Sequence, residues 1–143
     1  MTPEGSTGSE YVLRAVGYVE SPLQSRGEAP KQGDEGSPEA WLVFEPRVAR
    51  ALRGVRAGTD VIVLTWLDRA RRDVLEVRPR GDRDRPLTGV FATRSPDRPN
   101  PVGLHRVRVV EADGLRWRVR DLEALDGTPV LDVKPVLERP GKR

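Results

Sequence analysis

Short apolar and alternating runs divide the chain into β-strands. Residues 102–110 and 115–120 alternate apolar with polar side chains, which is the two-residue period of a strand with one buried face. Residues 60–68 are apolar almost throughout and predict a strand buried on both faces. Further strands are expected over residues 11–20, 41–45, 73–78, 89–92 and 129–137. Seven or eight short strands predict a mainly β fold: a small closed or strongly curved β-barrel with one short helix and long loops.

The helix is expected to begin at Pro46 and to end before Gly54, with Val48, Ala51 and Leu52 on one face. Residues 21–39 form a long polar loop rich in glycine and proline. Structureless loops of this length are uncommon in compact domains and often functional, so this loop is a candidate for covering a ligand. Residues 78–86 are expected to form a second, charge-rich loop.

Chemistry is concentrated in a third loop, residues 93–101, between two expected strands. Its three prolines fix φ and remove backbone donors. The loop therefore presents Arg94, Ser95, Arg98 and Asn100 with less freedom than a glycine-rich loop would leave them. A stiff, cationic loop of this kind is more than a connector needs.

Composition narrows the possible functions. A length of 143 residues indicates one domain, expected over residues 11–139, between a disordered N-terminal tail (1–10) and a C-terminal tail (140–143). The absence of cysteine excludes disulfides, thiolate metal sites and cysteine nucleophiles. His105 is the sole histidine, so it cannot form a metal cluster alone, and we interpret it as a histidine on a strand face rather than a catalytic one. No long apolar span or signal peptide is evident, and a cytoplasmic location is expected.

The basic residues are nearly all arginine, and the formal net charge is only +3. Arg116, Arg118 and Arg120 form a stripe on one face of an expected strand; the stripe could contact a polyanion, although solvent exposure is the favoured interpretation. The three tryptophans, Trp41, Trp66 and Trp117, are expected in the core.

Several common sites are missing from the sequence. It contains no G-x-G-x-x-G motif after the first strand, no G-K-[ST] phosphate loop and no G-x-S-x-G nucleophile elbow. What remains is the Arg/Asn/Pro loop, a D-G-T-P turn at residues 126–129 and the segment D-V-K-P at residues 132–135.

These segments carry a resemblance to a known family. GVFATRSP at residues 89–96, RPNPVGL at 98–104, and the segments at 126–129 and 132–135 are similar to the signature of the TsaA-like (TrmO-type) S-adenosylmethionine-dependent methyltransferases. VGYVESP at residues 16–22 resembles the family's opening strand and turn, and PKQ at 30–32 resembles its Pro-Arg-Gln segment. The resemblance covers most of the chain.

The resemblance implies a β-barrel methyltransferase that works as a homodimer, with S-adenosylmethionine held near the subunit interface and no metal. Its best-known reaction is tRNA processing, the N6 methylation of threonylcarbamoyladenosine at position 37. By match to the family, the donor site would comprise Pro30, Lys31, Gln32, Asp68, Arg69, Arg94, Leu104, Glu123, Ala124, Leu125 and Asp126.

Arg94 is the first choice for anchoring an anionic group by charge-assisted hydrogen bonds. Substrate contacts are expected from Arg98, Asn100 and Lys134, although Asn100 could instead cap its own turn and Lys134 could pair with Asp132. Asp126 is first a turn residue. No general base is named, because methyl transfer depends mainly on positioning and desolvation.

Two departures from the family leave the acceptor open. Asp68 stands where the family usually has histidine, and the chain ends soon after Lys134, whereas longer bacterial relatives continue into a C-terminal domain that helps to bind tRNA. The alternatives are a methyltransferase with the same donor and a small-molecule acceptor, and a non-catalytic binding module on the same barrel.

Overall fold

Six strands close into a barrel in the computed structural model, which describes residues 8–24 and 38–137. They follow the order β1-β2-β7-β6-β3-β8, every pair is antiparallel, and β8 closes the barrel by pairing with β1. The barrel strands are β1 (Gly17–Glu20), β2 (Ala40–Phe44), β3 (Asp60–Trp66), β6 (Val102–Asp113), β7 (Arg116–Arg120) and β8 (Pro129–Pro135). The prediction of a mainly β, closed barrel with a short helix is confirmed.

Alternation along the strands fills the barrel interior with side chains. Inward-facing residues form one core cluster made mostly of valine, with Leu42, Phe44 and Trp117 as its largest members. Phe44 and Trp117 pack edge to face with ring centroids 4.7 Å apart. Strand β3 alternates between buried and half-buried residues, so the prediction that both of its faces are buried is wrong. Its outward side chains lie on the barrel's outer surface, over which the described residues form no second layer.

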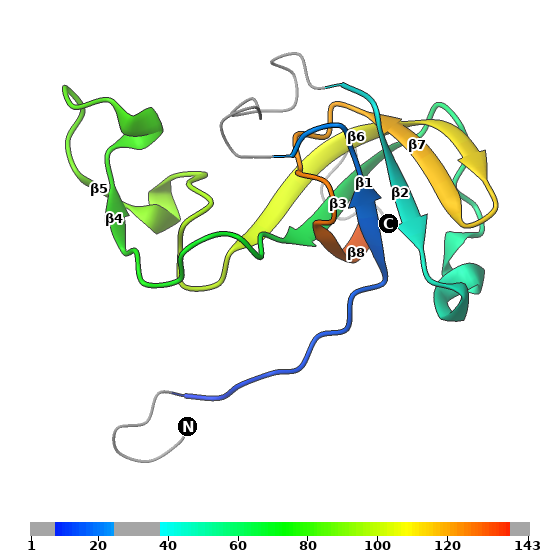
Figure 1. The fold of residues 1–143 in the computed structure, drawn as a ribbon, viewed down its shortest axis with the longest axis horizontal. Coiled ribbons are helices and arrows are strands. Elements are labelled where there is room, and N and C mark those ends of the chain that lie inside the picture. Colours follow the sequence, from blue (N-terminus) through cyan, green and yellow to red (C-terminus); the bar gives the residue numbers. More distant parts are fainter. Residues whose placement is uncertain (1–7, 25–37, 138–143) are drawn as a thin grey trace.

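Residues 67–101 form an arm outside the barrel. Figure 1 shows the short sheet of β4 (Glu76–Val77) and β5 (Thr88–Gly89) standing well away from the barrel wall. Pro79–Gly81 and Val90–Ala92 are 3₁₀ turns within the arm. The strand expected over residues 89–92 is therefore wrong beyond Gly89, and the one over 73–78 shrinks to two residues. The apolar side chain of Phe91 is 85% exposed, so apolar composition alone misled the assignment.

The first strand is shorter than its sequence pattern predicts. Residues 11–15 lie outside the sheet, and Figure 1 shows this segment running away from the barrel. Val16 stays attached to the barrel, since its amide donates to the carbonyl of Val130 at 2.8 Å. Tyr11 and Val12 are almost fully exposed, because no strand lies beside them to bury them. At the other side of β2, the predicted helix is present as a 3₁₀ helix over Pro46–Leu52.

Two of the three tryptophans lie outside the core. Trp117 is buried, but Trp41 and Trp66 are half-exposed, so the expectation for these two is wrong. Each is covered instead by a guanidinium, from Arg116 at 4.8 Å and Arg72 at 5.2 Å from the ring centroid.

Carboxylates neutralise most of the arginine stripe on β7. Arg116 pairs with Glu20 at 2.9 Å, and Arg118 pairs with Glu39 and Glu111. These pairs are exposed, which agrees with the favoured interpretation of a solvated face.

Three connections meet at one end of the barrel. Residues 67–101 leave β3 and return into β6 at this end, and residues 121–128 connect β7 to β8 there. The segment that follows β1 joins them, since the amide of Asp126 donates to the carbonyl of Leu23 at 2.7 Å. A register shift between Leu64 and Thr65 in the β3–β8 pairing lies at the same end. Bulges of this kind commonly redirect side chains next to functional sites.

Gly17 provides a direct test of barrel closure. A Cβ atom at Gly17 would lie 2.4 Å from the carbonyl oxygen of Val43, which is backbone of the paired strand and cannot move aside. Gly17→Ala should therefore destabilise the protein by about 1–3 kcal/mol, as overpacking does. Gly89→Ala is the control, because open space surrounds that position and its φ is −61°. Urea unfolding of both variants measures the difference, and equal stabilities would contradict the described β1–β2 contact.

Candidate functional site

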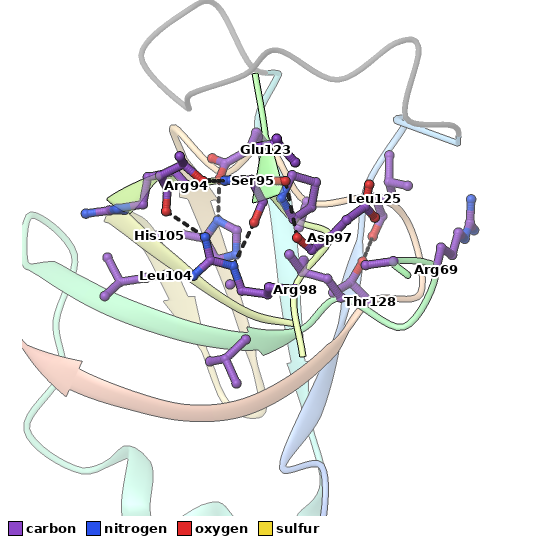
Figure 2. Close-up of a pocket in the computed structure, with 18 of the residues that line it drawn as sticks. Arg69, Arg94, Ser95, Asp97, Arg98, Leu104, His105, Glu123, Leu125 and Thr128 are labelled. Atoms are coloured by element: carbon purple, nitrogen blue, oxygen red, sulfur yellow. Dashed lines mark hydrogen bonds and ion pairs between the residues drawn. The ribbon is translucent and has the colours of Figure 1, made fainter. Parts of the chain in front are cut away.

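A cleft of about 1700 Å³ opens where the three connections meet. Its walls come from Asp60 at the start of β3, the first half of β6, the arm and residues 120–128. Figure 2 shows Glu123 beside the ring of His105, with Arg69 and Arg94 on opposite sides of the view. Residues distant in sequence thus surround a single space.

The floor of the cleft is polar, unlike the rest of the barrel interior. Thr65 on β3 and His105 on β6 are buried and hydrogen-bonded, with 2.7 Å between Thr65 Oγ1 and His105 Nε2. The other ring nitrogen, Nδ1, lies 2.5 Å from Glu123 Oε1. Burying polar groups costs little when each is hydrogen-bonded, so the barrel tolerates this pair at its end.

The alternation of residues along β6 indicates the position of His105. Gly103, His105, Val107 and Val109 are alternate residues of β6, and all four are buried. His105 therefore lies inside the barrel mouth, among the inward-facing residues. The earlier interpretation correctly placed it on a strand face but missed its contact with Glu123.

Arginine side chains hold the proline-rich loop in shape. Arg98 donates from Nε to the carbonyl of Ser95 at 2.7 Å, and from Nη2 to the carbonyls of Thr93 and Val90 at 2.6 and 2.8 Å. Prolines have no N–H, so these side-chain donors supply the hydrogen bonds that the loop backbone lacks. Arg98 thus organises the loop. It also lines the cleft, and its expected contact with substrate stays a prediction.

Arg72 clamps the end of the same loop. It donates to the carbonyl of Pro99 at 2.7 Å and to Asn100 Oδ1 at 2.9 Å, and its guanidinium covers the ring of Trp66. Asn100 does not line the cleft among the described residues, and its side chain serves this clamp. Arg72 was not singled out by sequence reasoning, since nothing local distinguishes it from the neighbouring arginines.

Most described members of the expected donor site line the cleft. They are Asp68, Arg69, Arg94, Leu104, Glu123, Ala124 and Leu125. Arg94 is exposed and has no hydrogen-bond or ion-pair partner within the described residues, so its guanidinium is available to a ligand. Arg69 donates to the carbonyl of Gln24 at 2.6 Å, which ties the segment after β1 to the arm. Pro30, Lys31 and Gln32 lie outside the described residues.

Two other candidates take structural roles away from the cleft lining. Asp126 accepts a hydrogen bond from the amide of Ser21 at 2.9 Å, and Gly127 beside it has a φ of 83°. Asp126 is therefore a turn residue, as the sequence predicts. Lys134 pairs with Asp132 at 3.4 Å on exposed β8, which is the structural alternative for this residue.

The cleft is electropositive. Nine arginines and five acidic residues line its described part. Asp60 holds two of the cations, with 2.7 Å to Arg108 Nε and 3.3 Å to Arg106 Nη2. The hydrogen bond from Arg108 lowers the pKa of the Asp60 carboxyl, opposed by burial and supported by the bond from Arg106.

A closed antiparallel barrel with a cationic, loop-lined cleft at its mouth is typical of a ligand-binding barrel. Comparison with known proteins makes the class specific. The family described as "tRNA-methyltransferase O N-terminal domain" matches residues 18–140, and the chain belongs to this family.

Relatives and solved structures agree with this placement. A "Probable S-adenosyl-L-methionine-binding protein" of Methanothermobacter thermautotrophicus is 46% identical over 129 residues, covering 90% of this chain and 92% of the relative. An "S-adenosyl-L-methionine-binding protein" of Archaeoglobus fulgidus is 41% identical over 123 residues, covering 86% and 87%. The "Crystal structure of TrmO from Pseudomonas aeruginosa" superposes with a TM-score of 0.72 and 26% identity over 94% of this chain. This chain spans 62% of that solved chain.

Two kinds of feature are absent from the described residues. None of the helices described is long and apolar enough to cross a membrane. No group of three or more His, Cys, Asp or Glu side chains in the described ranges is placed to hold a metal ion.

The ion pairs of Asp60 generate a pH-dependent prediction. The pKa of the Asp60 carboxyl is lower in the folded protein than in the unfolded chain, where it is about 3.8. The ion pairs therefore contribute fully to stability at pH values above about 3.8. Their contribution is lost as the pH falls through the pKa of the folded state. Asp60→Asn should therefore be less stable than wild type at pH 7 and nearly equal to it at pH 2. Urea unfolding at both pH values measures this, with Asp113→Asn, on the exposed end of β6, as control. A stability difference that does not change with pH would contradict the assignment.

Proposed function

We propose that the protein is an S-adenosylmethionine-dependent methyltransferase whose donor binds in the cleft at the barrel end. The observation that carries this proposal is the convergence of Asp68, Arg94, Leu104 and the segment 123–125 around one cleft. The names of the relatives from Methanothermobacter and Archaeoglobus support the same donor.

The lining residues match the chemistry of this donor. S-adenosylmethionine carries a carboxylate, an ammonium, a sulfonium and an adenine. Arg94 offers a cation for the carboxylate, Glu123 offers an anion for a positive group, and Leu104 and Leu125 offer apolar surface for the base.

The reaction is a direct displacement at the methyl carbon. A nucleophilic nitrogen of the acceptor forms a bond to the methyl group as the carbon–sulfur bond breaks, and the electron pair stays on sulfur in the neutral thioether product. The nitrogen then loses a proton to solvent or to a nearby base. The protein's part is to align donor and acceptor in a cleft that excludes water, and that part needs no nucleophilic residue.

For the acceptor we propose tRNA, with N6 methylation of threonylcarbamoyladenosine at position 37. The family description supports this choice, and so does the excess of arginine over acidic residues along the cleft, since phosphate contacts dominate nucleic-acid affinity. A small-molecule acceptor is the second candidate, favoured by the anionic side chain of Asp68 on the cleft wall.

We also propose that the protein works as a homodimer and that it does so in the cytoplasm. The arm carries Leu75, Leu87 and Phe91, whose side chains are 68%, 53% and 85% exposed, and a partner subunit would cover them. Light scattering should give twice the chain mass for the wild type and a shift toward monomer for Phe91→Ser. A monomeric wild type would contradict the dimer without affecting the donor site.

Donor binding can be measured by calorimetry. The wild type should bind S-adenosylmethionine, and Arg94→Ala should weaken binding about 10- to 100-fold, because a charge-assisted hydrogen bond contributes about 1.5–3 kcal/mol. Arg50→Ala is the matched control, since Arg50 is exposed on the 3₁₀ helix away from the cleft. Equal losses in both variants, or no binding by the folded wild type, would contradict the proposed site.

The acceptor is tested separately with methyl-labelled donor. Purified protein should transfer label to tRNA that contains threonylcarbamoyladenosine and not to tRNA made without it, and mass spectrometry of nucleosides should find the N6-methylated product. Label in small metabolites but not in tRNA would support the second candidate. Binding without transfer to either would indicate a non-catalytic module.

A further inference from the structure

His105 is a buried titratable residue that the proposed reaction does not yet use. Its side chain is 4% exposed, and both ring nitrogens are engaged, Nε2 by Thr65 and Nδ1 by Glu123. Burial requires a hydrogen-bond partner for each ring nitrogen, and here one of the two partners belongs to a loop of the cleft wall. The contact therefore links the rigid barrel to a residue of the cleft wall.

The hydrogen bonds define how the ring is oriented. An ionised carboxylate only accepts hydrogen bonds, so His105 Nδ1 carries a proton and donates it to Glu123. The Thr65 hydroxyl can donate to Nε2 of a neutral ring or accept from that of a charged ring. Both bonds thus persist in either protonation state, and the ring has one favoured orientation.

The backbone leaves room for this pair. Gly103 lies directly opposite Thr65 in the β3–β6 pairing. A Cβ atom at Gly103 would lie 2.4 Å from Thr65 Oγ1 and 2.7 Å from His105 Nε2. Glycine at this position allows the two polar side chains to meet across the strands.

Glu123 gains its orientation from this contact. It lies on the connection from β7 to β8, where a glutamate side chain has several accessible rotamers and loses entropy when it is fixed. Its side chain is 21% exposed and lines the cleft. Within the described residues His105 alone pairs with the carboxylate, at Oε1, so Oε2 has no partner there.

We propose that His105 is a positioning residue, which holds the Glu123 carboxylate toward a cationic group of the ligand in the cleft. This inference rests on the proposed donor site, because S-adenosylmethionine supplies two such groups, its sulfonium and its ammonium. The energetic benefit comes from preorganisation: the barrel fixes the carboxylate before the ligand arrives.

The experiment is a double-mutant cycle on donor affinity, with folding checked by thermal unfolding. Glu123→Gln should weaken S-adenosylmethionine binding about 10-fold, because it removes the charge and keeps the shape. His105→Leu should cause a similar loss, and the double variant should be no weaker than the weaker single variant, since both changes remove one interaction. Glu111→Gln, the same change on exposed β6, is the control and should bind as wild type.

Conservative variants separate positioning from packing. His105→Gln retains an N–H donor for Glu123 and an acceptor for Thr65, so it should recover most of the affinity that His105→Leu loses. If His105→Leu does not fold, the cycle is run with Thr65→Val, which keeps the buried shape but leaves His105 Nε2 without its partner. This variant should lose about 2- to 5-fold in donor affinity, and the loss should be absent in the Glu123→Gln background.

A second ligand identifies the cationic group. S-adenosylhomocysteine keeps the ammonium but has a neutral sulfur. If Glu123 contacts the sulfonium, Glu123→Gln weakens only S-adenosylmethionine; if it contacts the ammonium, both ligands weaken equally. Either result supports the inference, and unchanged affinity for both ligands overturns it.

Failure of the inference differs from failure of the proposed function. The positioning role is overturned, and the donor site stays in place, if the wild type binds the donor and the losses from His105→Leu and Glu123→Gln multiply in the double variant. Folded wild type that binds neither ligand overturns the donor site itself.

Discussion

Barrel closure through β8 is the constraint on which the site depends. Strand β8 pairs with β1 on one side and β3 on the other, and it completes a sheet whose barrel strands have no free edge. Closure brings the chain after β1, the arm after β3 and the connection before β8 to the same barrel end. Residues separated by more than fifty positions, such as Arg69 and Glu123, therefore line one cleft.

The same closure sets where polar groups can lie inside the barrel. Its core cluster consists of valine, leucine, alanine and aromatic side chains, and buried polar side chains such as Thr65, His105 and Thr128 lie near the end that carries the cleft. At that end the barrel core and the cleft wall meet through Glu123. A loop of the proposed ligand site is thus braced directly by a strand of the barrel.

Arginine has two roles in this chain. Arg98 and Arg72 donate to loop carbonyls that no backbone donor reaches, and so convert a proline-rich segment into a fixed wall. Arg94, in the same segment, has no partner within the described residues and faces the cleft. Arg94 can be held in one place for a ligand because the guanidinium groups of Arg98 and Arg72 fix the shape of the loop that carries it.

Local periodicity predicted those strands and that helix whose burial pattern repeats along the sequence. The alternation of β6 and β7 and the helical spacing after Pro46 appear in the structure because each reports which face of an element is buried. Periodicity failed for most of residues 11–16 and 89–92: Tyr11, Val12 and Phe91 are exposed, although Val90 is buried and Val16 packs against the core. Pairing partners are set by tertiary structure, and a single sequence does not report them.

The residues of the site were predicted from the sequence motifs of a known family and not from the physical properties of the side chains. The family resemblance grouped Arg94, Leu104 and Glu123, which the structure brings together, yet it could not show that Arg98, which also lines the cleft, holds the loop in shape. That distinction depends on hydrogen bonds across the fold. The packing of His105 beneath Glu123 depends on which face of β6 points inward, which the burial alternation of that strand indicates only once the barrel is known.

The central claim is that the cleft at the barrel end is the S-adenosylmethionine site. Amide NMR spectra recorded during titration with the donor test it most directly. The account predicts that the largest shifts fall on residues 94–98, 103–105 and 123–125, while the 3₁₀ helix Pro46–Leu52 is unchanged. Shifts centred on that helix or on the outer faces of β7 and β8, with the cleft unaffected, would contradict it.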